Sequence, residues 1–207
     1  MGGILLLLSK SWVVIEMRAG VLARAARAAS GLTQIEFASR SGIAGSSLSL
    51  IEHGKREPTV ATLDTLLRAA RQTVVAIPTV RSDAAGIASE IAIALVEPDG
   101  LSVYRRFLQL ADNLAAESGA TRVGLTLTEP SPTGSEQWDA AIAALCEYRL
   151  KADHLPVPNW IIKRVGFPTR PWAPSTSRYN IPADPTKVPE EFLRRGILIE
   201  AQTLESV

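Results

Sequence analysis

This 207-residue sequence offers few cysteine and histidine side chains for nucleophilic catalysis or metal binding. The chain contains one cysteine, Cys146, and two histidines, His53 and His154. Structural zinc sites draw on several cysteine and histidine ligands, and a nucleophile needs a base beside it, so neither chemistry is predicted. No phosphate-binding glycine loop, zinc-binding histidine pair or nucleophile-elbow sequence is present either. We therefore expect no enzymatic activity, no metal and no cofactor.

The single cysteine also bears on the compartment in which the protein works. Cys146 cannot form an internal disulfide, and it stands on the apolar side of a helical pattern, so we expect a buried, unreactive thiol. The two histidines stand in turn-like segments and are expected at the surface. With 46% hydrophobic and 21% charged residues, the composition is that of an ordinary globular protein, and we expect a cytoplasmic location.

Basic side chains can bind phosphate groups, and in this sequence they are unevenly distributed. The eight basic residues of the segment 17–78 outnumber four acidic ones, which gives this segment a charge of +4, whereas residues 79–207 carry −3. Guanidinium and ammonium groups pair with phosphates. A basic segment joined to a mildly acidic one is therefore typical of a nucleic-acid-binding domain followed by a second region.

The elements that would position these cations can be predicted from the same segment. Thr33 and Glu36 have the spacing of a capping box, which predicts a helix that starts directly after Thr33. Gly42 is expected to take a left-handed conformation in a turn, followed by a second helix over residues 45–52. Thr59 then caps a further helix, whose leucines close a small core.

This order of signals, T-Q-x-E, then A-x-x-S-G-I, then I-E-x-G-K-R-x-P, resembles the Xre-type, lambda-repressor-like helix-turn-helix family over residues 21–70. The resemblance implies double-stranded DNA as the partner, with the helix over residues 45–52 in the major groove. It also implies that Gln34 bonds a DNA phosphate, as the family's glutamine does. The residues that the resemblance places at the DNA are Gln34, Arg40, Ala44, Gly45, Ser46, Ser47, Ser49, Leu50, Lys55 and Arg56.

One departure from the family concerns base recognition. Many relatives carry Gln, Arg or Asn at the base-facing positions, where bidentate groups distinguish one base from another. Here these positions hold Gly45, Ser46, Ser49 and Leu50. Serine hydroxyls discriminate bases weakly, and a leucine can contact only a thymine methyl group, so we expect binding that is mainly electrostatic, with DNA shape as a further source of specificity. The cations assigned to this role are Arg27, Arg40, Lys55 and Arg56.

The composition divides the chain into four parts. Residues 1–16 hold an apolar run that is too short to cross a membrane, without a basic leader or a cleavage signal, and we interpret them as a doubtful N-terminal extension. Residues 17–78 are the helix-turn-helix domain, and residues 79–86 are a short polar linker. Residues 87–207 are expected to form an accessory or partner-binding domain.

This second domain mixes several patterns. Helices are expected on both sides of residues 98–100 and over residues 136–152, whereas the β-branched stretch 122–127 predicts a short strand. Eight prolines between residues 156 and 189 exclude a long helix there. The expected fold class is therefore mainly α, with a five-helix, lambda-repressor-like N-terminal domain. The C-terminal domain is expected to be mostly helical, with a few short strands and a proline-rich extended segment.

The aromatic residues of the proline-rich segment suggest a protein partner. Trp160, Phe167 and Trp172 are its candidate anchors, although both tryptophans could instead pack onto the domain's own core. Residues 156–206 are also similar to helix-turn-helix proteins paired with nucleotidyltransferase-type toxins. That similarity implies an antitoxin-type autorepressor with a cognate toxin, and it is compatible with a homodimer.

Two other hypotheses stay open at this point. The chain could be a transcription regulator that senses a small ligand through its C-terminal half, without a toxin partner. It could instead be an interaction protein whose helix-turn-helix has degenerated.

Overall fold

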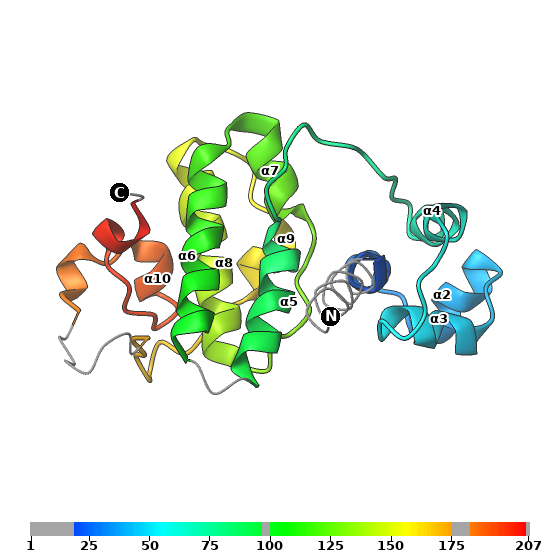
Figure 1. The fold of residues 1–207 in the computed structure, drawn as a ribbon, viewed down its shortest axis with the longest axis horizontal. Coiled ribbons are helices and arrows are strands. Elements are labelled where there is room, and N and C mark those ends of the chain that lie inside the picture. Colours follow the sequence, from blue (N-terminus) through cyan, green and yellow to red (C-terminus); the bar gives the residue numbers. More distant parts are fainter. Residues whose placement is uncertain (1–18, 97–99, 175–182, 206–207) are drawn as a thin grey trace, which may run out of the picture. The chain divides into compact units, whose positions relative to one another are not determined.

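The structure is a computed structural model that describes residues 19–96, 100–174 and 183–205 (Figure 1). The predicted extension 1–16 and the predicted helix break at Pro98 and Asp99 lie outside the described residues. The chain divides into two compact units, Met1–Ile77 and Pro78–Val207. Within the described ranges every regular element is a helix, which confirms the mainly α class, and the expected short strands are replaced by one isolated β-bridge.

The first unit contains the predicted helix-turn-helix. A helix covers residues 19–29 and is followed by α2 (Gln34–Ser41), α3 (Gly45–Glu52) and α4 (Val60–Ala69). Between residues 19 and 77 these four helices take the place of the five expected. The chain leaves α4 through Arg71, whose φ of 58° is left-handed. Residues 72–77 form no helix, and Pro78 disfavours helical backbone at Ile77 directly before it.

Capping residues start and end these helices at the predicted positions. The Thr33 hydroxyl accepts a hydrogen bond from the Glu36 N–H, and the Glu36 carboxylate accepts one from the Thr33 N–H at 2.8 Å. These bonds complete the capping box, and the bond from the Thr33 N–H lowers the pKa of Glu36. Gly42 ends α2 with a φ of 68°, a left-handed conformation that is costly for residues with a side chain. Thr59 caps α4 by accepting a hydrogen bond from the Thr62 N–H.

The core of the first unit is small and draws on all four helices. Its buried residues are Ala23, Ala26, Leu32, Phe37, Leu48, Ile51, Leu66, Leu67 and Ala70. The first helix approaches the end of α3 most closely at Gly20, where an added Cβ would collide with the carbonyl oxygen of Ile51. Glycine at this position therefore allows the first helix to lie directly against the recognition helix.

The second unit is organised around α8 (Glu136–Ala152). Its residues are buried without interruption from Trp138 to Glu147, as expected for a helix enclosed on all sides. Around it pack α5 (Ala84–Leu95), α6 (Gly100–Ala116) and α7 (Gly119–Leu127), with α5 and α6 side by side (Figure 1). The helix predicted over residues 136–152 is thus confirmed.

The strand predicted over residues 122–127 is wrong, because this stretch belongs to α7. Arg122 donates to the carbonyl oxygen of Arg149 at 3.0 Å and to the carboxylate of Asp153 at 2.7 Å. These contacts with the end of α8 outweigh the β-propensity of the local sequence. The structure also differs from the predicted linker 79–86, since α5 starts at Ala84 and Asp83 caps it.

In its described residues, 156–174 and 183–189, the proline-rich segment forms only the short helices α9 (Asn159–Lys163) and η1 (Pro185–Lys187), in agreement with the predicted absence of a long helix. The chain after it forms α10 (Glu190–Leu193) and η2 (Ala201–Leu204). Both α9 and α10 contact α8, so α9 holds the proline-rich segment on the core of its own unit. Trp160 is buried there, and its indole N–H donates to the carbonyl oxygen of Thr126 at 2.9 Å.

A buried arginine joins α8, α9 and α10. The Arg195 guanidinium donates to the carbonyl oxygens of Arg164 (2.7 Å), Ile161 (2.8 Å) and Glu191 (2.8 Å), and it pairs with the Glu147 carboxylate at 2.7 Å. Both side chains of the pair are nearly inaccessible to solvent. A buried charge is tolerated only when it is paired and hydrogen-bonded, and this arrangement satisfies both conditions.

Glu147 is the anionic member of this cluster. Burial raises the pKa of its carboxyl group, but hydrogen bonds from Lys151 and Arg195, with a further bond from Arg194, outweigh burial and hold the pKa below its ordinary value of 4.5. The folded state therefore gains stability from the ionised carboxylate. This gain is complete above pH 4.5 and is lost as the pH falls below that value.

The variant Glu147→Gln removes the charge at nearly constant volume and leaves buried Arg195 without its anion. We expect the free energy of unfolding of the second unit to fall by about 3–5 kcal/mol at neutral pH. Urea denaturation followed by tryptophan fluorescence measures this loss, because three of the four tryptophans, Trp138, Trp160 and Trp172, belong to the second unit. The variant should also lose the contribution to acid sensitivity that we expect from Glu147 below pH 4.5.

A matched control is Lys187→Gln, which breaks an exposed ion pair with Asp184 at 3.6 Å. Exposed pairs contribute little, so the urea midpoint should not move. Equal losses in the two variants would contradict the importance assigned to the buried pair.

Candidate nucleic-acid interface

The two helices of the motif, α2 and α3, pack against each other and against α4 within the first unit. α2 ends at Gly42, and α3 begins only three residues later, at Gly45. The left-handed backbone of Gly42 changes the chain direction within this short turn. The angle between α2 and α3 therefore depends on this local turn. This is the arrangement that places a recognition helix in the major groove.

α3 has an inward and an outward face. Leu48 and Ile51 are buried at 0% and 2% exposure, whereas Leu50 between them is 42% exposed. Ser46 is also exposed, and in the described part of the chain its hydroxyl makes no hydrogen bond. The outward face therefore offers one unengaged hydroxyl and one apolar side chain.

The ten residues predicted to contact DNA come from α2, α3 and the two turns after them. Seven are exposed: Arg40, Ala44, Gly45, Ser46, Leu50, Lys55 and Arg56. Gln34, Ser47 and Ser49 are half-buried. All ten belong to the first unit, which is also the basic part of the chain.

Sequence analysis did not predict the role of Glu52, at the last position of α3. Its carboxylate accepts from Arg27 Nε at 2.7 Å, from Arg27 Nη2 at 3.2 Å and from Gln34 Nε2 at 2.9 Å. The Glu52 side chain is only 3% exposed. One carboxylate thus ties the end of the recognition helix to the first helix and to the start of α2.

This network corrects the assignment of Arg27 as a cation available to DNA. Its guanidinium is held by Glu52, and Nη1 also donates to the carbonyl oxygen of Leu32 at 3.1 Å. The side-chain amide of Gln34 is held by the same Glu52 carboxylate. Its position in the first turn of α2 nevertheless places it beside N–H groups that have no acceptor within the helix. An anion is stabilised at such a helix start, and the phosphate contact of Gln34 stays a prediction.

The turn after α3 is built from backbone bonds to α3. The N–H groups of Lys55 and Arg56 both donate to the carbonyl oxygen of Leu50, at 2.8 and 3.2 Å, and Gly54 has a left-handed φ of 67°. The Arg56 guanidinium then donates to the Ser47 hydroxyl at 3.0 Å. Arg56 therefore lies along α3, and its cation is positioned beside the recognition helix.

Ser49 is also engaged within the motif. The His53 ring nitrogen Nδ1 lies 2.7 Å from the Ser49 carbonyl oxygen and 3.5 Å from its hydroxyl. With the hydroxyls of Ser47 and Ser49 both close to neighbouring side chains, Ser46 and Leu50 are the side chains of α3 that remain for base contacts.

Other residues considered for chemistry lie apart from this surface. Cys146 is fully buried in α8, and burial raises the pKa of its thiol. His154 is exposed just after the end of the same helix. Over the described ranges no three His, Cys, Asp or Glu residues are grouped to hold a metal ion. No described helix is long and apolar enough to span a membrane.

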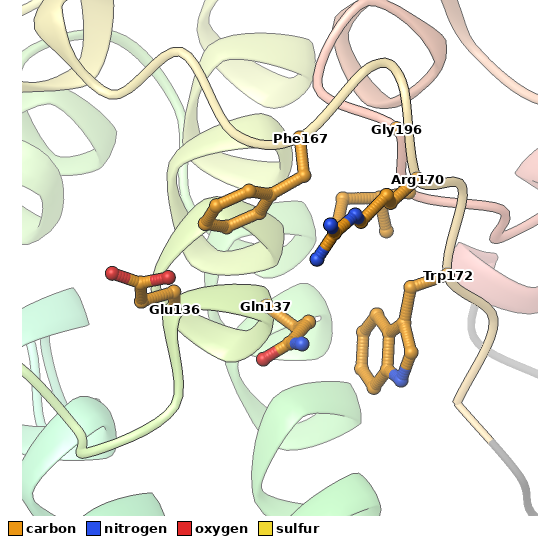
Figure 2. Close-up of a pocket in the computed structure, with 7 residues that line it drawn as sticks. Glu136, Gln137, Phe167, Arg170, Trp172 and Gly196 are labelled. Atoms are coloured by element: carbon orange, nitrogen blue, oxygen red, sulfur yellow. The ribbon is translucent and has the colours of Figure 1, made fainter.

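Of the three candidate partner anchors, one is inaccessible. Trp160 is buried in its own unit, whereas Phe167 and Trp172 are half-buried and line a pocket (Figure 2). The pocket belongs entirely to the second unit and is separate from the residues predicted to contact DNA.

Residues 24–72 match a family model described as Helix-turn-helix. No curated protein and no solved structure matches the chain. The matched range contains α2, α3 and α4 with their caps and all ten residues predicted to contact DNA. The first unit therefore carries a DNA-binding helix-turn-helix of the transcription-regulator class.

The variant Glu52→Gln tests the network that holds α3. It leaves the half-buried Arg27 without an anionic partner, so we expect the first unit to lose about 1–3 kcal/mol of stability. Duplex binding should weaken as well, because α3 and Gln34 lose a shared anchor. Circular dichroism during urea unfolding and fluorescence anisotropy with labelled duplex DNA measure the two effects.

Asp64→Asn is the control, since Asp64 pairs with Arg68 on the exposed side of α4. This control should leave unfolding and DNA binding unchanged. A Glu52→Gln protein that unfolds and binds like the control would refute the role assigned to Glu52.

Proposed function

We propose that the protein is a transcription regulator that places α3 in the major groove of its operator and holds the duplex mainly through phosphate contacts. The observation that carries this proposal is the outward surface of the motif. It combines small or apolar side chains on α3 with the exposed cations Arg40, Lys55 and Arg56 around it.

The distribution of charge supports this mode of binding. The +4 charge of residues 17–78 includes three exposed cations, Arg40 in the last turn of α2 and Lys55 and Arg56 in the turn after α3. Arg27 is not available in the same way, because it is paired with Glu52. Phosphate contacts made by such cations release counterions and make affinity depend steeply on salt. They position the protein on DNA without selecting a sequence.

The narrower prediction of an antitoxin-type autorepressor stays a prediction. It depended on a partner-binding proline-rich segment, but α9 of this segment packs on α8 and Trp160 is buried. A cognate toxin would thus have to bind an already folded surface. Copurification of the full chain with the product of a neighbouring gene would test this role.

The double variant Lys55→Ala and Arg56→Ala tests the electrostatic part of the proposal. It should weaken binding to all duplexes alike and reduce the slope of log affinity against log salt by about one unit for each phosphate that is no longer neutralised. Anisotropy titrations with a random duplex and with a duplex selected from a random library, at several salt concentrations, measure the slope.

Arg68→Gln removes an exposed cation that is bonded to Asp64 on α4, outside the proposed surface, and serves as the control. If the double variant had the salt slope of this control, the two cations would not contact phosphates. If the wild-type protein showed no salt-dependent binding to any duplex, the helix-turn-helix would have degenerated to a scaffold.

Leu50 should contribute a preference for thymine at one position of the selected site. It is the exposed apolar side chain of α3, and apolar side chains discriminate thymine by contact with its methyl group. Replacing thymine by uracil at each position in turn removes only this methyl. One substitution should weaken binding to wild-type protein by severalfold, up to about tenfold, and leave binding by Leu50→Ala unchanged.

The same substitutions include their own control, because uracil at uncontacted positions leaves affinity intact. A wild-type protein that is insensitive to uracil at every position would show that Leu50 reads no thymine methyl.

A further inference from the structure

The second unit contains a pocket that the DNA-binding function does not use. Its cavity of about 130 Å³ lies between the first turn of α8 and the chain around Phe167, Arg170 and Trp172 (Figure 2). A cavity of roughly 150 Å³ can hold a benzene molecule, so this pocket has room for a small organic group. One side is formed by Glu136 and Gln137 of α8.

Backbone hydrogen bonds hold the wall of the pocket in place. The N–H of Phe167 donates to the carbonyl oxygen of Arg195 at 2.8 Å, and the N–H of Trp172 donates to that of Gly196 at 2.7 Å. Gly196 has a φ of 71°, and a Cβ there would collide with the carbonyl oxygen of Phe167. Glycine thus allows the two chain segments to meet closely, and the pocket is preformed.

An aromatic cluster supports the base of the pocket. The Trp172 ring meets the buried Trp138 ring edge-on, with centroids 5.0 Å apart, and Trp138 in turn contacts Phe107 at 5.6 Å. Trp172 is therefore anchored by the core on one side. Its other side faces the pocket, whose lining also includes Phe167 (Figure 2).

Two opposite charges border this aromatic surface. Figure 2 shows the Arg170 guanidinium and the Glu136 carboxylate on opposite sides of the Phe167 ring. Both side chains are exposed, and neither makes an ion pair or a side-chain hydrogen bond within the described residues, so both charges are available to a ligand. Two unpaired opposite charges at one preformed pocket suit a ligand that brings both complementary charges.

The start of α8 adds hydrogen-bond donors on the same side. The Ser135 hydroxyl accepts from the Trp138 N–H, which leaves the N–H groups of Glu136 and Gln137 without an acceptor in the helix. The Gln137 side-chain oxygen accepts from the Ser135 hydroxyl at 3.1 Å, so its amide N–H groups remain available. These donors favour a carboxylate between Arg170 and the helix start.

We infer that this pocket binds a small zwitterion of the amino-acid class. Its carboxylate pairs with Arg170 and the first turn of α8, its ammonium group pairs with Glu136, and its apolar side chain lies on Trp172 and Phe167. A simple anion would be repelled by Glu136, and a simple cation by Arg170. A residue inside a peptide chain lacks both backbone charges, so the free amino acid fits better than a peptide segment.

This inference goes beyond DNA binding and gives the second unit a sensing role. The test uses the full chain and measures binding by calorimetry and by tryptophan fluorescence, since Trp172 lines the pocket. The probes are the free L-amino acids, with L-phenylalanine compared against 3-phenylpropionate, which lacks the ammonium group, and phenethylamine, which lacks the carboxylate. We expect at least one amino acid to bind below about 10 mM, and each single-charge analogue of phenylalanine to bind about tenfold more weakly than phenylalanine.

Variants of Arg170 and Glu136 test whether the amino acid binds in this pocket. Arg170→Gln and Glu136→Gln should each weaken the amino acid by about tenfold. Arg105→Gln, at an exposed arginine of α6 outside the pocket, should have no effect. All three proteins should bind duplex DNA like the wild type in the absence of amino acid, which separates a failure of this inference from a failure of the DNA-binding proposal.

Three results would overturn the inference. The first is the absence of binding by every free amino acid. The second is equal binding of 3-phenylpropionate and phenylalanine, which would make the pocket an anion site or the seat of an acidic side chain of a protein partner. The third is binding that survives both charge variants.

Discussion

The recognition helix depends on one buried carboxylate. Glu52 closes α3 and binds Arg27 of the first helix and Gln34 of α2, so three segments that are distant in sequence share a single anion. Hydrophobic packing of Leu48 and Ile51 is non-directional and would allow α3 to rotate or slide. Hydrogen bonds to a charged group are directional and strong, and they therefore define the orientation of α3 within the first unit.

A buried ion pair also organises the second unit. Arg195 is buried and gathers carbonyl oxygens from segments around α9 and α10, with Glu147 of α8 as its counter-ion. The prolines prevent this region from forming long helices, so it has few internal backbone bonds of its own. A buried guanidinium with several donors supplies bonds that regular secondary structure would otherwise make. Arg170, by contrast, is exposed and lines the pocket beside Phe167 and Trp172, where its charge is available to a ligand.

The accuracy of sequence prediction differed between the two units for a physical reason. The bounds of α2 and α3, the capping box and the left-handed Gly42 are set by residues within four positions of one another, and all were predicted. The stretch 122–127 was predicted as a strand because its local propensity favours one, but contacts of Arg122 with the end of α8 hold it in a helix. Arg27 was likewise assigned to DNA, because its partner Glu52 lies 25 residues away.

The sequence by itself determined the helix-turn-helix, its basic character and the weak base-reading set on α3, since caps, turns and side-chain types are local properties. It also determined that the region from Pro156 to Pro189 contains no long helix. Only the tertiary structure decided which side chains are free to act. It buried Trp160, engaged Arg27 and Ser47, and left Arg170 and Glu136 unpaired at a preformed pocket. Whether a polar or aromatic side chain is available depends on partners that folding brings together from distant positions, and no local pattern specifies them.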